Sequence, residues 1–570
     1  GRANTDLISG AGSSEVELYR FVGGIEGKFD PFGRELTAQL VGNYGRSTTQ
    51  GRERVLVQQN FANALNAVRD ASGAIVCAPG SVNANIATIS STCAPINPFG
   101  QQISQAARDY VTTTADPRAQ NEQWVVTASI AGQLFDIWGG GVGFALGYEH
   151  RDEKASFNPG LFYAGELNAD GTRSQFGRSV PIDPVSGGFN TDEVFGELTV
   201  PLIGPDQNIP LVNRLELHGA GRYIKNSLAG GDWTYTGDAR WELFEGVALR
   251  GNYTRSVRAP AVTELFNPTS QIFTTANDPC DSRFINGGPT GTARAANCAA
   301  AGLPASFESN IVDFTARGSL SGNPALRNEK ADAITIGLIL RPTFLRGFSA
   351  TVDWVDIELK GAIESLDATQ VLEGCYDSTT FPSALCDSFT RDAAGQVTFV
   401  QTGYANAASR DFQGLVTQVA YNAPTPFLGV ESSVNLVANY QYTDKLEVQV
   451  GSGDLSRLRN SPGYSPHKGT VNATYLNSGF GVSLQWLYFG KTKNDPDQPN
   501  SAFEFPTIEA VSYFNGSVSF DVDKKYSLRF IVDNIFDKGA PFPAPANGGT
   551  VTYIDGIIGR TFRVGTSLRF

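Results

Sequence analysis

The way its strands are connected is the feature that most constrains how this chain can fold. Segments with period-two alternation are joined in pairs by turns of a few residues, and long polar loops separate one pair from the next. In residues 480–488, large apolar or aromatic side chains alternate with Gly481, Ser483 and Gln485. One face is therefore apolar, and the other is too polar to form a protein core. Short turns on one side and long loops on the other predict an all-β fold, a transmembrane antiparallel β-barrel.

The alternation recurs in about seventeen segments. The expected strands are residues 15–29, 34–47, 122–135, 140–152, 190–203, 212–228, 231–243, 245–257, 328–343, 346–361, 396–424, 430–446, 465–477, 479–491, 508–522, 525–536 and 559–570. If the last strand runs toward the short turns, so does the first, and Gly1 then lies on the side of the long loops.

The odd strand count carries a further expectation. Single-chain bacterial barrels normally have an even number of strands, and an open edge in hydrocarbon leaves amides and carbonyls unpaired at a cost of several kcal/mol each. We therefore expect an N-terminal part, cut or otherwise separate from this chain, to complete the wall. The alternative is that the strand count is wrong by one, and the long segment 396–424 is where such an error would most easily arise.

Composition restricts the class of protein. Hydrophobic residues make up 41% of the chain, mean hydropathy is −0.17, and no apolar run approaches the roughly 20 residues of a membrane-spanning helix. If the chain lies in a membrane, it crosses as strands. The net charge of −13 and the lack of a basic stripe argue against a nucleic-acid partner. Methionine and a signal-peptide pattern are both missing, so we expect a processed or partial chain.

Six cysteines fall into three local pairs in loop-like segments. The pairs are Cys77 with Cys93, Cys280 with Cys298, and Cys375 with Cys386. This spacing predicts one disulfide in each of three loops and an oxidising compartment. The alternatives are free thiols or a metal site, but the chain lacks a Cys-x-x-Cys motif and its three histidines are scattered. We therefore expect disulfides, no metal site and no cofactor.

Short motifs occur in order from residue 255 to the end of the chain. Residues 255–260 read Arg-Ser-Val-Arg-Ala-Pro, with Glu-Leu-Phe at 264–266; residues 323–330 read Asn-Pro-Ala-Leu-Arg-Asn-Glu-Lys; and residues 532–537 read Val-Asp-Asn-Ile-Phe-Asp before a last alternating strand at 560–570. In this order they resemble the barrel half of TonB-dependent outer-membrane receptors. The resemblance covers essentially the whole chain and is to a proteobacterial subgroup with small disulfides in several outer loops.

One position departs from the family's pattern, because Asn328 stands where the family commonly has proline. The resemblance implies a barrel of twenty-two strands around a plug domain. It also implies that the inner-membrane TonB complex supplies the energy for transport through an N-terminal TonB box. Residues 1–570 would then hold strands 6 to 22, and the plug, the box and the first strands would belong to a segment outside this chain. The terminal strand, with Phe562, Val564, Leu568 and Phe570, resembles the signal read by the barrel-assembly machinery.

Several side chains have expected places in such a barrel. Interfacial aromatic belts are predicted for Trp124, Tyr148, Tyr253, Trp354, Trp486 and Tyr488. The lumenal face is predicted to carry Glu149, Glu197, Glu216, Arg222, Arg250 and Asp353. Arg255 and Arg258 lie where a strand leaves the membrane, so either they contact lipopolysaccharide phosphates or a loop carboxylate, or they bind solute. Phe273 and Tyr376 are loop aromatics that could stack on a ligand.

A function follows from these expectations. No Gly-x-Ser-x-Gly, HExxH or phosphate-loop motif occurs, so we expect no enzyme. The resemblance implies a bacterial outer-membrane active transporter whose extracellular loops, 48–121, 258–327 and 362–395, capture a scarce solute for import to the periplasm. The alternatives are a passive pore, adhesin or structural barrel, and a soluble glycan binder. Siderophore, vitamin, oligosaccharide and peptide importers share such barrels, and the subgroup resemblance favours a carbohydrate or a peptide.

Overall fold

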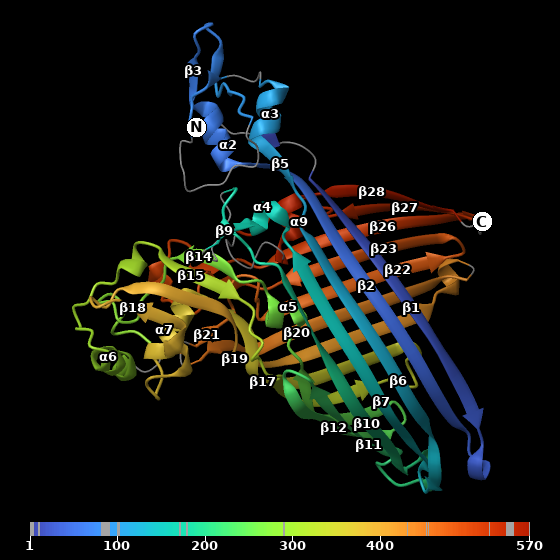
Figure 1. The fold of residues 1–570 in the computed structure, drawn as a ribbon. Coiled ribbons are helices and arrows are strands. Elements are labelled where there is room, and N and C mark those ends of the chain that lie inside the picture. The colour runs from blue at the N-terminus through green and yellow to red at the C-terminus, as the bar shows by residue number, and fades with distance from the viewer. Residues whose placement is uncertain are drawn as a thin grey trace.

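Long antiparallel strands form a curved wall, and most of the folded loop material gathers at one end of it (Figure 1). The computed structural model describes residues 5–8, 12–80, 92–99, 103–169, 173–177, 180–288, 291–429, 431–451, 453, 455–523, 525–542 and 552–568. We call the end of the wall that carries the long loops the loop end, and the opposite end, where short turns join the strands, the turn end. Gly1 and Phe570 lie outside the described residues, so the expectations for them are not examined by the structure.

Seventeen strands form the wall in the described part of the chain, and each pairs antiparallel with the next. In hydrogen-bonded order they are β1 (Ser13–Phe29), β2 (Leu36–Leu56), β6 (Arg118–Ile137), β7 (Gly140–Asn158), β10 (Val185–Ile203), β11 (Arg214–Asn226), β12 (Gly230–Phe244), β13 (Val247–Arg258), β16 (Glu329–Leu340), β17 (Phe348–Leu366), β19 (Val397–Pro424), β20 (Ser433–Val450), β22 (His467–Asn477), β23 (Phe480–Phe489), β26 (Val511–Asp523), β27 (Tyr526–Asp533) and β28 (Thr561–Leu568). Every expected segment overlaps one of these strands, and residues 397–424 form a single strand, so the predicted fold class and strand count are confirmed.

Shorter elements belong to the loops. Five more strands complete the 22-stranded sheet of the described residues: β5 (Thr112–Ala115), β14 (Ser270–Thr274), β15 (Ala316–Ser321), β18 (Phe389–Arg391) and β21 (Ser456–Arg457). Three small hairpins are β3 (Ala67–Arg69) with β4 (Ile75–Cys77), β8 (Glu166–Leu167) with β9 (Arg173–Ser174), and β24 (Thr492–Lys493) with β25 (Thr507–Ile508). The 22 strands of this sheet are thus not 22 wall strands.

The helices of the described residues are short and lie in the loops. They are α1 (Thr5–Ile8), α2 (Gln58–Leu65), α3 (Gln105–Val111), α4 (Gly160–Ala164), α5 (Val262–Phe266), α6 (Gly291–Ala300), α7 (Ala368–Tyr376) and α9 (Ile554–Ile558), with 3-10 turns at Pro31–Gly33, Pro205–Gln207, Asn310–Val312, Ala384–Ser388, Pro426–Leu428 and Asn500–Ala502. Among the described helices, none has the length and hydropathy needed to cross a bilayer.

Strand register separates an apolar outer face from a polar inner face. On the outer face Tyr44 lies opposite Trp124, with ring centroids 4.6 Å apart, and Trp354 lies opposite Ile336. On the inner face, one row of opposed residues across β11, β12, β13, β16 and β17 contains Glu216, Arg240, Arg250, Gly337 and Asp353. The same alternation places Glu149, Glu197 and Arg222 on the inner face. Among the described residues, most large apolar side chains of the wall therefore point outward, and the ion-paired inner face does not form an apolar core.

The wall has two unpaired edges in the described residues. Every residue of β1 is exposed, as are all but the first of β28, and no pairing joins these two strands within the described chain. Because seventeen strands alternate in direction, β1 and β28 run the same way, each from the loop end to the turn end. Direct pairing of the two edges would therefore be parallel, unlike every other pair in the wall.

Two of the three expected loops are shorter than predicted. Strand β2 continues to Leu56 and β6 begins at Arg118, so the first loop is residues 57–117 rather than 48–121. Strand β17 continues to Leu366, so the third begins after it rather than at 362. Polar and charged residues such as those at 46–54 look like loop in sequence, but they form strand because the wall continues beyond the apolar band at the loop end.

Candidate functional site at the loop end

Two loops that are distant in sequence fold together into one body, which we call the loop lobe (the described residues of 267–321 and 366–403). Strand β15 pairs parallel with the loop end of β19. Strand β14 pairs antiparallel with β15, and β18 pairs antiparallel with β19. Ile311 of segment 267–321 and Leu372 of segment 366–403 are 1% and 0% exposed in one apolar cluster. The sequence predicted two separate loops here, but the structure brings them together.

Buried ion pairs hold the loop lobe together. Arg391 donates to both carboxylate oxygens of Asp278, at 2.8 Å each, and to the Tyr376 hydroxyl at 3.0 Å. Arg294 donates to both oxygens of Asp377 at 2.6 Å. Each pair joins segment 267–321 to segment 366–403, and each is bidentate, the geometry in which Arg–carboxylate pairs are strongest.

Three disulfides brace the loops. Cys280–Cys298 and Cys375–Cys386 both lie in a single cluster of the loop lobe, with Cys280 and Cys298 0% exposed. Cys77–Cys93 lies in the first loop, beside a separate cluster that contains Leu7 of α1 and residues of α2 and α3. The pairing is the one that local spacing predicts. In the part of the chain that the structure describes, no group of His, Cys, Asp or Glu is placed to hold a metal ion.

The motif at 255–266 forms the base of the loop lobe together with the motif at 323–330. Arg258 contacts the carboxylates of Glu329 and Glu264, and the Glu264 carboxylate accepts the backbone N–H of Ala261 at 2.7 Å, which caps α5. Leu265 and Leu326, each 1% exposed, pack in one cluster, and the N–H of Asn323 donates to the carbonyl of Glu264 at 2.9 Å. These residues anchor the loop lobe to the wall.

The four residues proposed from sequence as ligand contacts occupy different environments. Arg255, on the outer face, donates to both oxygens of Asp332 at 2.8 and 2.7 Å, so both proposed arginines are paired with carboxylates. Phe273 is 59% exposed on β14 and remains free to contact a ligand. Tyr376 is 3% exposed, lies against Phe381 and Phe389, and has a pKa raised by burial. Tyr376 is therefore a packing residue of the loop lobe, and the sequence-based stacking role is not available to it in this arrangement.

The inner face of the wall carries ion pairs below the loop lobe. Arg250 donates to both oxygens of Asp353 at 2.8 and 2.6 Å. The ring of His218 lies between Asp238, 2.6 Å from Nδ1, and Glu197, 3.0 Å from Nε2. Such a surface favours contact with water or a polar partner rather than with lipid.

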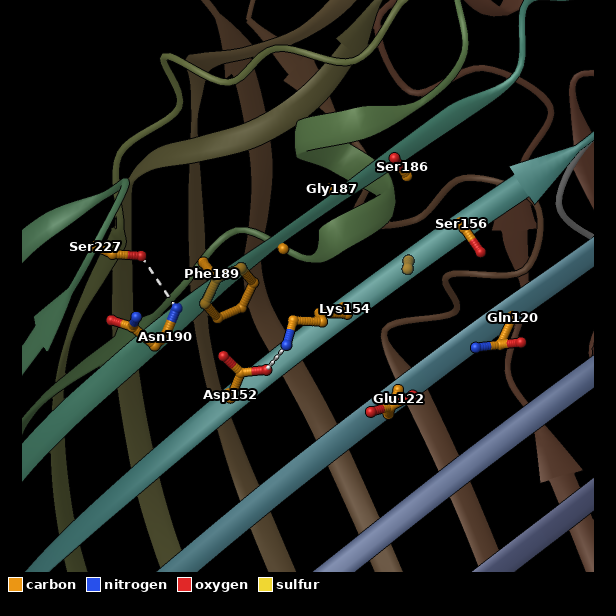
Figure 2. Close-up of a pocket in the computed structure, with 12 residues that line it drawn as sticks. Gln120, Glu122, Asp152, Lys154, Ser156, Ser186, Gly187, Phe189, Asn190 and Ser227 are labelled. Carbon is orange, nitrogen blue, oxygen red and sulfur yellow. Dashed lines mark hydrogen bonds and ion pairs between the residues drawn. The ribbon is translucent and has the colours of Figure 1, made fainter.

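Two hollows lie back to back at the loop ends of β6, β7 and β10. The outer one, which we call the outer groove, has a volume of about 500 Å³ and is lined by polar side chains that include Glu122, Asp152 and Lys154 (Figure 2). The inner one, which we call the inner pocket, has a volume of about 360 Å³ and lies between these strands and the segment from α5 to β14. A third hollow, of about 350 Å³, lies under the loop lobe beside Asn323 and Tyr404. The sequence pointed to the loops but to none of these hollows.

An outward apolar face, an inner face lined by ion pairs and hollows under braced loops define a membrane β-barrel of the receptor class. Residues 17–535 match the family model described as TonB dependent receptor-like, beta-barrel, and the chain belongs to this family. This membership places it among outer-membrane receptor barrels. Comparison with curated proteins finds no match.

Solved structures of receptors share the fold. The siderophore receptor PirA of Acinetobacter baumannii is 14% identical with a TM-score of 0.55, over 97% of this chain and 63% of that one. A mutant of the ferric enterobactin receptor PfeA of Pseudomonas aeruginosa, in complex with enterobactin, is 14% identical with a TM-score of 0.51, over 94% of this chain and 62% of that one. At these identities the likeness shows the fold alone. The chain spans less than two thirds of the length of either structure.

Proposed function

We propose that this chain is the greater part of the wall of an outer-membrane active transporter, in which the loop end faces the outside and captures a solute. The observation that carries this proposal is the loop lobe, where two loops share a core, two disulfides and two buried bidentate ion pairs. A diffusion pore has no need of so rigid a body at its mouth. A receptor does, since a preorganised binding surface loses less entropy when solute binds.

The rest of the transporter is part of the same proposal. Unpaired edge groups are costly in hydrocarbon, so further strands must cover β1 and β28. Because these edges run in the same direction, an odd number of added strands gives antiparallel pairing throughout, and the five strands implied by the family resemblance satisfy this condition. Val16, Leu18 and Val22 on the inner face of β1 are 65%, 71% and 60% exposed, which supports contact with a plug.

The partners follow from the same reasoning. The energy for import comes from the inner-membrane TonB complex, acting on the plug. Lipopolysaccharide contacts the outer rim, and the barrel-assembly machinery inserts the chain. The steps are binding and gating with no covalent chemistry, so the protein is not an enzyme.

Solute uptake by cells distinguishes this function from a passive pore. Cells with and without the complete protein are compared for solutes that disappear from the medium, measured by untargeted mass spectrometry, in strains with and without the energy-coupling protein. We expect at least one solute to be accumulated against its gradient, and only when both proteins are present. Uptake that persists without the coupling protein and stops at equal concentrations would show a passive pore.

A further inference from the structure

The inner pocket lies where the usual polarity of the wall is inverted. Along β7, the inner side carries Glu149 and Arg151 near the middle of the strand, but Ala155 and Phe157 at the loop end. The outer side of β7 becomes polar at the loop end, where Lys154 and Ser156 point into the outer groove (Figure 2). Above the lipid band, apolar side chains therefore turn inward, toward the volume enclosed below the loops.

Hydrogen bonds and close packing fix the walls of the inner pocket. Phe157 lies opposite Val185 in the register of β7 and β10, and both are half-buried. A backbone bridge joins Ile182 to Ser270, and the N–H of Ile182 donates to the carbonyl of Tyr163 at 2.8 Å. The pocket is thus closed on one side by segments that are held in place.

One glycine is required for the packing of an aromatic wall residue. A Cβ atom at Gly187 would lie 2.4 Å from Cγ of Phe266, so the ring of Phe266 rests directly against the backbone of β10. Helix α5, which contains Phe266, is itself capped and tied to the wall through Glu264 and Arg258. The motif at 255–266 therefore positions a side chain of the inner pocket.

The chemistry of the lining is neutral. None of the described residues that line the inner pocket is ionisable, and the hydrogen-bonding side chains that it offers are hydroxyls and the amides of Asn121 and Asn267. The outer groove, built from the other side of the same strands, contains Glu122, Asp152 and Lys154. The volume of about 360 Å³ lies at the small end of the range for small-molecule sites. A charged group placed here would lose its hydration without gaining a counter-ion.

We propose that the inner pocket binds an uncharged part of the transported solute, an aromatic or aliphatic group that carries an amide or a hydroxyl. This inference rests on the proposed function, because it takes the solute to enter from the loop end. The proposal excludes a solute whose group in the inner pocket is a carboxylate, a phosphate or an anionic metal chelate.

Two probes that differ only in charge test the proposal. N-Acetylphenylalaninamide is neutral, and N-acetylphenylalanine carries a carboxylate at neutral pH. Binding to the purified complete protein in detergent is measured by saturation-transfer NMR. We expect the amide to bind about tenfold or more tightly than the acid, a difference of one decade in Kd. Equal binding of both probes, or tighter binding of the acid, would overturn the proposal.

Adjacent residues on β10 supply a matched pair of variants. Val185→Asp places a charge inside the inner pocket, whereas Ser186→Asp places it on the other side of the strand, in the outer groove. We expect the first to lose at least tenfold in affinity for the amide probe and the second to change little. Folding of each variant is checked by its heat-dependent mobility on gels. If Val185→Asp does not fold, Ile182→Glu, in the segment before β10, places a charge in the inner pocket instead. Unchanged binding in a folded inner variant contradicts the proposal.

The test can fail separately from the proposed function. Probe binding is measured on purified protein and needs no energy coupling, whereas active uptake is measured in cells. Uptake that depends on the coupling protein, together with no preference for the neutral probe, would retain the transporter and reject the neutral pocket.

Discussion

The wall and the loop lobe reach stability by opposite means. In the wall, Ile336 and Val564 are 63% and 69% exposed, and the inner face is polar, so lipid has to cover the apolar side chains. In the loop lobe, Leu372 and Val400 are 0% exposed, and charges are buried as hydrogen-bonded pairs. The lobe is therefore a small water-exposed domain built on a membrane sheet. Its stability depends on its own core and cross-links, and that of the wall depends on the bilayer.

The largest effect is expected where a buried charge loses its partner in the loop lobe. Asp278→Asn leaves Arg391, whose side chain is 12% exposed, without a counter-ion, and breaking such a pair costs about 3–5 kcal/mol. Hydrogen exchange of α7 should accelerate while that of the wall strands does not change. Asp313→Asn is the control, because Asp313 is 59% exposed and its pair with Arg283 is worth about 0–1 kcal/mol. Acceleration throughout the wall would show that lobe and wall are one cooperative unit.

Removing a disulfide should act on the same region with a smaller effect. Replacing Cys280 and Cys298 by serine frees a loop of 18 residues, which costs about 3 kcal/mol in the chain-entropy model. Limited proteolysis should then cut within the loop lobe. The matched control replaces Cys77 and Cys93, with a separation of 16 residues in the first loop, and should leave proteolysis of the loop lobe unchanged. Equal cleavage of the lobe in both double variants would contradict the independence of the two loop bodies.

A charge on the outer face should affect the wall and spare the loop lobe. Ile336→Arg is expected to cost about 2 kcal/mol in lipid, the lower end of the range for arginine at the bilayer midplane, because Ile336 lies on the outer face opposite Trp354. The measurement is equilibrium unfolding in phospholipid vesicles. Thr335→Arg, one residue away on the inner face, should cost much less. If the two variants were equally destabilised, the assignment of outer and inner faces would be wrong.

The difference between wall and lobe also explains what the sequence could predict. Period-two alternation is a local signal, so all wall strands could be located from neighbouring residues alone, and local spacing sufficed for the cysteine pairs. The partner of Arg391 lies 113 residues away, and no local pattern marks it. Tyr376 looked like a ligand contact because a loop aromatic was taken to be exposed, whereas segment 366–403 packs into the core of the loop lobe. The inner pocket was missed because its lining comes from segments between residues 119 and 270 that only the fold brings together.

The smallest effect is expected from acid, and again in the loop lobe. The Arg283 guanidinium, with the backbone N–H of Ser309, lowers the pKa of Asp281 to about 2. An aspartate whose pKa is lower in the folded state stabilises that state fully above its unfolded pKa, near 4, and the contribution is lost as pH falls from about 4 through 2. Hydrogen exchange of the segment around Asp281, compared at pH 5 and pH 2.5 after correction for the intrinsic rate, should show loss of protection in the wild type. Asp281→Asn lacks the titrating group, so it should show less protection at pH 5 and a smaller further loss at pH 2.5. An equal loss in both proteins would mean that other carboxylates govern the acid response of the loop lobe.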